Sequence, residues 1–399
     1  MTKKKQQGLV VSFAFVSLLN IKIHAQTTIF THQQESSAES LSSDAWSVYL
    51  KGFIQTDIAL DFQDIGSKDG MSAPSIAIPQ INSVSSNFSI RQSQIGLGVK
   101  QLSENGAPTD LSAYIEIDFF GPNGTTQPRF RKGYIQWKNL LIGQTWSNFS
   151  DNIFPNIFDF AGPNGTMSMR TIQLRYTAHL SKKEDLSLSL EDPNTVSILL
   201  PTNSTDWKKK SVLPILTTAY RYGNERNHIK IGGILSPISY QIDGKNSKKS
   251  STQTIIGFGG MISGKIYSNL LNNFRFQTSY GKGYAKNNLV LSGGKYDAVP
   301  NIESNKLETL NLFNLVGIYE HWWTPKWSSV VYYSYSPLGR KEIIPENLIQ
   351  NFQNAGANII FQPYKKFRLG VEGNYGRSEN FARESAKAFR IQFSTSLSL

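Results

Sequence analysis

The chain ends in the stretch Phe389-Arg-Ile-Gln-Phe-Ser-Thr-Ser-Leu-Ser-Leu399, in which apolar and polar side chains alternate. One parity carries phenylalanine, isoleucine, threonine and leucine, and the other carries arginine, glutamine and serine. A period of two over this length indicates a β-strand with one apolar and one polar face. Such a strand is typical of an antiparallel sheet that closes into a membrane barrel, although Leu399 stands where an aromatic residue is usual.

The same period recurs through the rest of the chain. In residues 47–63, Ile54 and Ile58 share one face, and Lys51 and Asp57 share the other. We predict sixteen strands, near residues 47–63, 87–100, 110–121, 129–137, 140–146, 170–180, 185–191, 212–223, 226–241, 252–267, 270–282, 307–322, 327–337, 348–362, 366–376 and 387–399. Because a closed bacterial barrel requires an even number, the predicted fold is all-β, a transmembrane antiparallel barrel of about 16 strands.

The connections between these strands are of two kinds. The short joint Gly223-Asn224-Glu225 suits a periplasmic turn, and the longer segments Lys245–Ser251 and Ala285–Asn305 suit outer loops. A change of apolar parity between Ile90 and Ile95 predicts a bulge in the second strand. Aromatic girdles at the membrane interfaces would come from Trp137, Tyr319, Trp322, Trp323, Trp327, Tyr332 and Tyr333.

The N-terminus has the layout of a secretory signal. Met1–Lys5 is basic, Leu9–Leu19 is apolar, and Ile23-His-Ala25 provides a cleavage site before Gln26. The apolar run is shorter than the roughly 20 residues that a spanning helix needs, so a retained anchor is the weaker alternative. We predict a signal peptide over 1–25, a flexible polar extension over 26–45 and a barrel over 46–399, in the outer membrane of a Gram-negative bacterium.

Composition excludes several classes of protein. The 399 residues contain no cysteine, so stability must come from the backbone ladder and from burial. The net charge of +12 favours anionic partners in general, but the basic residues are dispersed and no recognition helix is visible. Nucleic acid is therefore not an expected partner.

Signals for an enzyme are weak. The chain has no GxxxxGK[ST], HExxH or GxSxG motif, and its five histidines are scattered. Glu116 and Asp118 lie two apart on one strand face, but paired acids in this setting more often belong to a solvated pore wall than to a catalytic site. We expect no catalytic activity, no cofactor and no metal.

One connection is unusually long and apolar for a loop in water. The stretch Gly143–Thr177 begins and ends as a strand, and between them it carries phenylalanines, isoleucines, Asp151 and Asp159. Gly162-Pro163-Asn164-Gly165 within it reads as a tight turn. Loops of this length in such a pattern are disordered or functional, and we expect this one to fold into the lumen and narrow the pore.

Charged residues on the inward parity are the candidate pore wall. The predicted pore-lining and constriction residues are Lys51, Glu116, Asp118, Arg129, Arg131, Lys132, Asp151, Asp159, Arg170, Arg175, Arg275, Arg368 and Arg390. Positive and negative side chains on one wall can set an electric field across the pore. Alternatively, these charges pair with one another and stabilise the wall. The alternation leaves the facing of Arg131 open, and Asp151 and Asp159 complicate a purely anionic pathway.

Six motifs between residues 88 and 193, in this order, resemble the DcaP-like family of trimeric outer-membrane porins. They are Arg91-Gln-Ser-Gln-Ile-Gly96, Tyr114-Ile-Glu-Ile-Asp-Phe-Phe-Gly121, Arg129-Phe-Arg-Lys-Gly-Tyr134, Gly143-Gln-Thr-Trp-Ser-Asn-Phe149, Asp159-Phe-Ala-Gly-Pro163 and Arg170-Thr-Ile-Gln-Leu-Arg-Tyr176, followed by Glu191-Asp-Pro193. The resemblance implies a sixteen-stranded trimer that takes up small, often dicarboxylic, anions. Relatives can carry a coiled-coil segment near the N-terminus, whereas Thr27–Asp44 lacks a heptad.

The expected function is passive diffusion of small hydrophilic solutes through an anion-preferring porin, with carboxylates and dicarboxylates as solutes. Its expected partners are those anions, membrane lipid, lipopolysaccharide and two further copies in a homotrimer. The alternatives are a barrel enzyme of the outer membrane, a structural or adhesive barrel, and a soluble periplasmic β-rich binding protein. Large apolar outer faces disfavour the soluble alternative.

Overall fold

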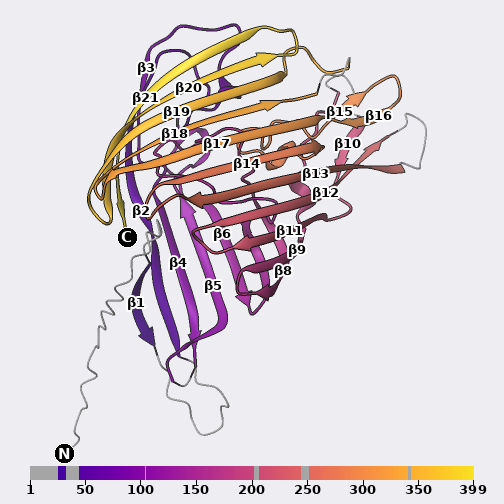
Figure 1. Cartoon of the computed structure of the whole chain (residues 1–399). Coiled ribbons are helices and arrows are strands. Elements are labelled where there is room, and N and C mark those ends of the chain that lie inside the picture. The colour runs from indigo at the N-terminus through magenta and orange to yellow at the C-terminus, as the bar shows by residue number, and fades with distance from the viewer. Residues whose placement is uncertain (1–25, 33–44, 104, 202–205, 244–250, 340–342) are drawn as a thin grey trace, which may run out of the picture.

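In the computed structural model, residues 26–32, 45–103, 105–201, 206–243, 251–339 and 343–399 are described. They form an antiparallel barrel (Figure 1) of β2 (Trp46–Asp61), β3 (Ser85–Ser89), β4 (Gln94–Leu102), β5 (Pro108–Asp118), β6 (Arg129–Trp137), β7 (Leu140–Trp146), β8 (Arg170–Ser181), β9 (Glu184–Glu191), β11 (Ile215–Gly223), β12 (His228–Ile242), β13 (Ser251–Tyr267), β14 (Asn273–Lys282), β17 (Asn311–Thr324), β18 (Trp327–Pro337), β19 (Ile349–Tyr364), β20 (Phe367–Asn380) and β21 (Ser385–Ser398). The short elements are β1 (Gln26–His32), β10 (Trp207–Lys210), β15 (Ala298–Asn301), β16 (Lys306–Thr309), η1 (Ala73–Ser75), η2 (Pro122–Gly124), η3 (Pro193–Thr195) and η4 (Ala285–Asn287).

β3 and β4 are two halves of one barrel strand, so the barrel has the predicted sixteen strands. Both halves pair with β2, Asp57–Asp61 with β3 and Trp46–Phe53 with β4. The chain leaves the ladder between them, where the Ser93 N–H donates to the carbonyl of Ile90. This interruption accounts for the change of parity seen in the sequence, and it is larger than the predicted bulge.

The barrel closes between its first and last strands. Asp61 of β2 lies opposite Arg390 of β21, and the ladder continues to Phe53 opposite Ser398. On β21, Phe389, Ile391, Phe393 and Leu397 are exposed on the outside, whereas Arg390, Gln392, Ser394 and Ser396 are buried inside. The faces predicted from the alternation are confirmed here, and no edge of the main sheet is left between β2 and β21.

The predicted N-terminal extension, residues 26–45, contains a strand in its described part. β1 pairs antiparallel with β2, from Gln26 opposite Lys51 to His32 opposite Trp46. It covers the part of β2 that lies beyond the end of β21 (Figure 1). The predicted signal peptide, 1–25, and residues 33–44 of the extension lie outside the described residues, so these two predictions stay predictions.

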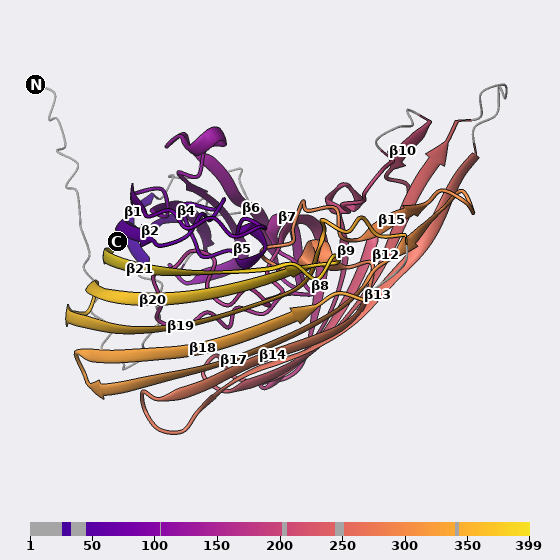
Figure 2. The ribbon, with the colours of Figure 1, turned by 90° about the horizontal axis from the view of Figure 1, so that it is seen from above.

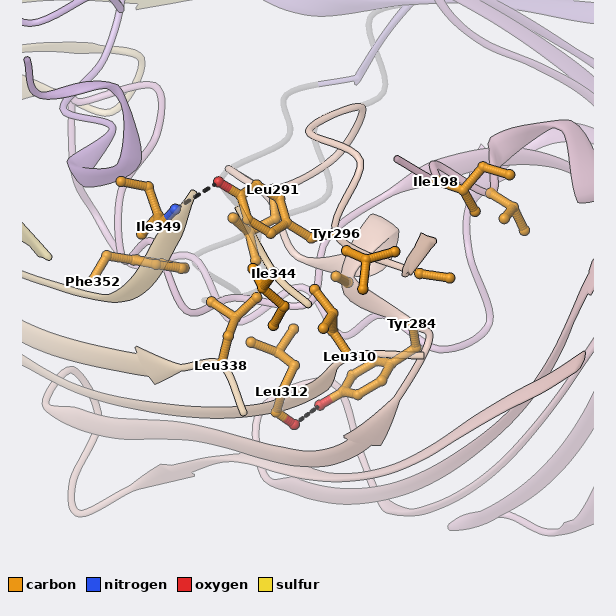
Figure 3. Close-up of a cluster of buried hydrophobic side chains, with 14 of the residues drawn as sticks. Ile198, Tyr284, Leu291, Tyr296, Leu310, Leu312, Leu338, Ile344, Ile349 and Phe352 are labelled. Carbon is orange, nitrogen blue, oxygen red and sulfur yellow. Dashed lines mark hydrogen bonds between the residues drawn. The ribbon is translucent and has the colours of Figure 1, made fainter. Parts of the chain in front are cut away.

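Apolar side chains from several loops pack together inside the barrel and form a core on one side of the lumen. In Figure 2, strands β14 and β17–β21 run along one side and β2–β8 along the other, with loop segments between them. Figure 3 shows the core, where the Ile349 N–H donates to the Tyr296 hydroxyl at 3.2 Å and the Tyr284 hydroxyl donates to the Leu312 carbonyl at 2.8 Å. Buried members from the loops are Ile65, Met71, Val196, Ile198, Tyr284, Leu291, Tyr296, Val299, Leu307, Leu310, Leu338 and Ile344.

This core adds to one sequence interpretation. The segment Ala285–Asn305 joins β14 to β17 at the strand ends opposite the short β13–β14 turn, as expected of an outer loop, but it folds inward, because Ala285, Leu291 and Val299 are buried. Its buried Asp297 accepts backbone N–H groups of Ser197 at 2.7 Å and Lys286 at 2.9 Å, which ties two loops together. The apolar residues in this segment are separated by polar and glycine residues, so no periodicity marks them as buried.

Most of the predicted girdle faces outward. Trp137, Tyr319, Trp323, Trp327 and Tyr333 are exposed on the barrel surface. The prediction is wrong for Tyr332, which is buried inside and donates to Asn374 Oδ1 at 2.6 Å. Trp322 is partly buried and donates from Nε1 to Glu320 Oε1 at 2.9 Å, which is a lumen-side contact rather than a girdle position.

We predict that Gly143→Ala destabilises the barrel, because Gly143 has φ of +129° and an added Cβ would overlap the Gly133 carbonyl oxygen and the Tyr134 backbone. A strained L-residue at such a position costs roughly 1–3 kcal/mol. After dilution from urea, a smaller fraction of the variant than of the wild type should refold into the barrel. The folded fraction is measured by the shift in gel mobility that heating causes. Gly260→Ala is the matched control, since its Cβ would meet nothing within 4 Å. Equal behaviour of the two variants would contradict the prediction.

Candidate functional site

The segment Ser147–Met169, here called the lumen loop, leaves β7 and returns to β8 through the interior. Its first residues bind Glu191 on β9: the Ser147 hydroxyl donates to Glu191 Oε2 at 2.8 Å and the Asn148 N–H donates to Oε1 at 2.8 Å. Phe149 is fully buried and packs edge-on against Tyr284, with ring centroids 5.9 Å apart. The predicted inward-folded loop is therefore present.

Asp151 fixes the next part of the lumen loop to β12 and β13. Its Oδ2 lies 2.9 Å from His228 Nε2 and accepts the Ser263 hydroxyl at 2.8 Å. Lys230 Nζ donates to the Ser150 carbonyl at 2.6 Å. Burial would raise the pKa of the Asp151 carboxyl, but these partners outweigh it and lower the pKa to about 2. Asp151 is thus a tether of the loop.

Arg275 of β14 holds the loop at its apolar stretch. The guanidinium donates to the carbonyls of Ile153 and Phe154 and forms an ion pair with Glu320, with Nη2 and Oε2 2.6 Å apart. Beside it, Ile153 and Ile157 pack against an apolar wall of Val316, Ile318, Val330 and Tyr332. Arg275 is buried and its donors are satisfied by these contacts. It therefore holds the loop in place and does not line the solute path.

Glu372 of β20 receives the middle of the loop. It accepts the N–H groups of Phe158 at 2.8 Å and Asp159 at 3.3 Å, and the Asn358 amide at 3.1 Å. Arg368, four residues earlier on the same face of β20, donates to the Asn156 side chain and lies 4.6 Å from the centre of the Phe158 ring. Glu372 thus holds the loop through its backbone, and Arg368 holds it through two of its side chains.

Asp159 and Arg390, both predicted to line the pore, are buried in a structural network. Asp159 accepts the N–H groups of Met71 at 2.8 Å and Ala161 at 2.9 Å, which joins the lumen loop to the loop after β2. Arg390 binds Asp61 through two hydrogen bonds of 2.6 and 2.9 Å, and lies 3.9 Å from Asp159. A buried pair of this kind is costly to break but offers no free charge.

The predicted turn Gly162–Gly165 sits against β18 and β19. Asn164 is fully buried; its N–H donates to Asn354 Oδ1 at 2.9 Å and its amide donates to the Met71 carbonyl at 2.9 Å. The Gly165 N–H donates to the Ser334 hydroxyl at 3.1 Å. Side chains from β9, β12–β14 and β17–β20 therefore hold the loop along its length.

A basic cluster lies on the other wall, on β5, β6 and β8. The pairing of β5 with β6 skips Arg131, since Glu116 lies opposite Lys132 and Ile117 opposite Phe130. This bulge settles the facing that the sequence left open: Arg131 turns inward, and donates to Glu116 Oε1 at 2.9 Å and to Asp118 Oδ2 at 2.8 Å.

The cluster holds more positive than negative charge. Arg129 donates to both oxygens of Asp118 yet keeps 40% of its side chain exposed. Lys132 contacts Glu116 at 3.1 Å. Arg170 lies close enough to Arg129 and Arg131 for their charges to interact. Four cations therefore share the carboxylates of Glu116 and Asp118.

Trp146 lies between two of these cations. Lys132 Nζ is 5.6 Å and the Arg170 guanidinium 5.1 Å from its ring centre. Arg170 has the parity of the outward-facing Ile172 and lies opposite Trp146 at the end of β7, yet it is close enough to Arg129 and Arg131 for their charges to interact. Its Nη1 is buried and has no hydrogen-bond partner among the described residues. The N–H groups of such a nitrogen donate most strongly to an anionic group.

Two further predicted residues lie on the same wall. Lys51 is held over the rings of Tyr49 and Tyr114 at 5.3 and 5.8 Å. Arg175 lies opposite Leu141 and Ser189, both buried on the lumen face. The candidate site thus divides: Asp151, Asp159, Arg275, Arg368 and Arg390 position the loop, and Lys51, Glu116, Asp118, Arg129, Arg131, Lys132, Arg170 and Arg175 lie on the opposite wall.

Sequence reasoning did not single out the wall residues that receive the loop. The predicted pore-lining residues do not include Glu191, Glu320, Glu372, His228 or Asn354. Their inward parity next to outward apolar neighbours is the signal that could have found them. In the part of the chain that the structure describes, no cluster of His, Cys, Asp and Glu could hold a metal ion, and no helix is long and apolar enough to cross a membrane.

Comparison with known proteins gives a family match and a fold match. A family model described as DcaP outer membrane protein matches residues 19–397. No curated protein sequence matches the chain. Among solved structures, the outer membrane channel DcaP of Acinetobacter baumannii has a TM-score of 0.73 and 21% identity, covering 89% of this chain and 97% of that chain.

Two other structures share the fold at lower similarity. An anion-selective porin from Comamonas acidovorans has a TM-score of 0.58 and 10% identity, covering 89% of this chain and all 100% of that chain. The outer membrane protein OmpT of Vibrio cholerae has a TM-score of 0.52 and 11% identity, with 91% and 100% covered. At these identities the likeness shows the sixteen-stranded fold.

We predict that the tether at Asp151 fails in acid. Because its pKa is lowered in the folded protein, its contribution to loop attachment, about 2 kcal/mol by linkage, is present above pH 4 and is lost as the pH falls to about 2. Single-channel current should become unsteady over that range. Asp151→Asn should show the unsteady current already at neutral pH and lose this pH dependence. A steady wild-type current down to pH 2 would contradict the role of Asp151.

Proposed function

The chain belongs to the DcaP outer membrane protein family, and we propose that it is a porin through which small hydrophilic solutes diffuse passively. Family membership confirms the resemblance predicted from the motifs and the location in the outer membrane. The channel function is supported by the closed barrel and by the fold shared with the DcaP channel and with porins. The solute path would run between the lumen loop and the wall of β2–β8.

We further propose that the channel prefers anions. The observation that carries this proposal is the basic cluster, in which Arg129, Arg131, Lys132 and Arg170 share, among the described residues, only the carboxylates of Glu116 and Asp118. An excess of positive charge beside a narrow, low-dielectric passage raises the local concentration of anions. Small carboxylates and dicarboxylates are the proposed solutes, and the solved porin from Comamonas acidovorans is an example of an anion-selective barrel of this fold.

The proposed assembly in the membrane is a homotrimer. Leu97, Ile115, Ile135 and Ile142 form an apolar outer face on β4–β7, with each residue between 43% and 53% exposed. This face can be covered by lipid or by another copy of the chain, and the predicted resemblance implies the second arrangement. The outer face at the level of the headgroups would contact lipopolysaccharide.

We predict that Lys132→Gln with Arg170→Gln reduces anion preference. Arg131 is left in place, because its removal would strand two buried carboxylates. In a salt gradient across a planar bilayer, the reversal potential of the wild type should favour anions and that of the double variant should move toward zero. The matched control removes two lysines exposed in periplasmic turns, Lys326→Gln and Lys366→Gln, and should keep the wild-type value. A cation-favouring wild type would contradict the proposal.

We predict that the wild-type protein adds current to a planar bilayer in groups of three equal steps. Each insertion of a homotrimer delivers three barrels at once, each with its own path. A cross-linked mass of three chains in detergent should accompany these groups. Insertion in single, independent steps together with a monomeric mass would contradict the trimer and leave the channel proposal intact.

A further inference from the structure

The sequence Gly-Pro-Asn-Gly-Thr occurs twice, once in an exposed turn at the end of the barrel and once inside it. Residues 121–125 include η2, between β5 and β6, and residues 162–166 belong to the lumen loop. A third Asn-Gly pair, Asn105-Gly106, lies in the turn between β4 and β5. The same dipeptide therefore stands in three different surroundings.

Asparagine followed by glycine is the dipeptide most prone to spontaneous deamidation. The backbone nitrogen of the glycine attacks Cγ of the asparagine, a C–N bond forms, and the side-chain nitrogen leaves as ammonia with the proton of the attacking nitrogen. Water then opens the resulting succinimide ring at one of its carbonyls, which leaves aspartate or isoaspartate. Glycine favours the attack because it has no Cβ to crowd the reacting nitrogen.

At Asn123, nothing in the described part of the chain holds the two reacting groups. Asn123 and Gly124 are exposed, and a Cβ at Gly124 would meet nothing within 4 Å. Among the described residues, neither the Asn123 side chain nor the Gly124 N–H forms a hydrogen bond. Asn123 has φ of 55° and ψ of 32°, so its peptide must rotate before the ring can close. An exposed peptide without hydrogen bonds is free to make that rotation.

At Asn164, the same two groups are fixed. Asn164 is fully buried; its Oδ1 accepts the Ala73 N–H at 2.7 Å and its Nδ2 donates to the Met71 carbonyl at 2.9 Å. The Gly165 N–H, which would be the attacking group, donates to the Ser334 hydroxyl at 3.1 Å. These bonds must break together before Gly165 can react, so we expect deamidation of Asn164 to be slow.

Asn105 is an intermediate case. It is exposed, but its Oδ1 accepts the Ser103 hydroxyl at 2.6 Å and the Ala107 N–H at 3.2 Å. The Gly106 N–H donates to the Ser103 carbonyl at 2.8 Å. Fewer bonds protect this pair than protect Asn164, and more than protect Asn123.

The turn that contains Asn123 lies next to the basic cluster. Arg91 donates to the carbonyls at both ends of the turn, at 2.9 and 3.0 Å. The ring of Phe120, directly before the turn, has the guanidinium groups of Arg91 and Arg129 each 5.1 Å from its centre. Phe120 also packs against Phe160 of the lumen loop, with ring centroids 4.2 Å apart. A carboxylate in this turn would therefore add negative charge close to cations of the proposed solute path.

We propose that Asn123 is a site of spontaneous deamidation, with water as co-reactant, and that the new carboxylate lowers the anion preference of the channel as the protein ages. The modification depends on the turn alone, whereas its effect on the current rests on the proposed anion channel. Isoaspartate also lengthens the backbone by one methylene, in a turn whose two ends bind Arg91.

The test incubates the folded, detergent-solubilised protein in warm, mildly alkaline buffer, beside a sample kept unfolded in urea. Deamidation is measured by mass spectrometry after cleavage at Lys, Arg and Glu. This cleavage places the three Asn-Gly pairs in separate peptides, 105–116, 117–129 and 139–170.

In the folded protein we expect Asn123 to deamidate roughly 10-fold or more faster than Asn164, because several hydrogen bonds must break at Asn164, and we expect Asn105 to fall between them. In urea, Asn123 and Asn164 should react at similar rates, since their neighbours in sequence are identical. Equal rates in the folded protein would overturn the proposal. So would a difference that persists unchanged in urea.

Two variants test the consequence for the channel. Asn123→Asp carries the charge of the product from the start, and Asn123→Gln keeps a neutral amide that closes a ring far more slowly. In a salt gradient, the reversal potentials of Asn123→Asp and of aged wild type should both lie closer to zero than that of fresh wild type. Asn123→Gln should keep the wild-type value, fresh and aged. A shift in aged Asn123→Gln equal to that of aged wild type would overturn the role of Asn123.

The two measurements separate this proposal from the one on which it partly rests. Deamidation of Asn123 with an unchanged reversal potential rejects the effect on the pore and retains the modification site. A cation-favouring potential in fresh protein rejects the anion channel, and the peptide masses still decide whether Asn123 is modified.

Discussion

The pairing of β21 with β2 is the constraint on which the rest of the structure depends. In hydrocarbon each unpaired backbone N–H or carbonyl costs several kcal/mol, so the sheet must close upon itself. Closure turns every second side chain of every strand inward, and Asp61, Gln392 and Arg390 show the result at the seam itself. The interior is therefore lined with polar groups that must find partners or water.

For the acidic residues of the later strands, those partners come from the lumen loop. Glu191, Glu320 and Glu372 would each be a costly buried charge, and each is satisfied by a backbone N–H of the loop or by Arg275. Since these acceptors lie on β9 and on the later strands, the loop is held against that side. The wall of β2–β8 is left with its own pairs and with an excess of cations. Attachment of the loop to the acidic residues of β9 and the later strands thus determines both where the solute path runs and which charge it prefers.

Local alternation was enough to predict much of the fold. The bounds of β6, β7 and β18 agree with the sequence, because a period of two and a tight turn such as Lys138-Asn139 are visible within ten residues. Register is not local. The inward orientation of Arg131 depends on a bulge opposite Glu116. The sequence of Arg129–Tyr134 alone does not predict this bulge.

The roles of the charged residues could be predicted only in part. Asp151 and Asp159 looked like pore acids, but their partners, His228 and Met71, lie 77 and 88 residues away in sequence. The apolar lumen core was missed for the same reason, since it is assembled from several loops. Tyr332 is a different case: Tyr333 beside it faces lipid, so alternation alone excludes an outward Tyr332.

The central claim is that solutes pass along β2–β8 and not along the wall that holds the loop. Because the chain has no cysteine, single cysteines can be labelled without background. The most direct measurement is the current through Arg175→Cys and Ser334→Cys channels during exposure to a negatively charged methanethiosulfonate reagent. Arg175 lies on the wall of β2–β8, and Ser334 is fully buried beneath Gly165 of the loop. The account predicts a stepwise loss of current for Arg175→Cys and none for Ser334→Cys; the reverse pattern would contradict it.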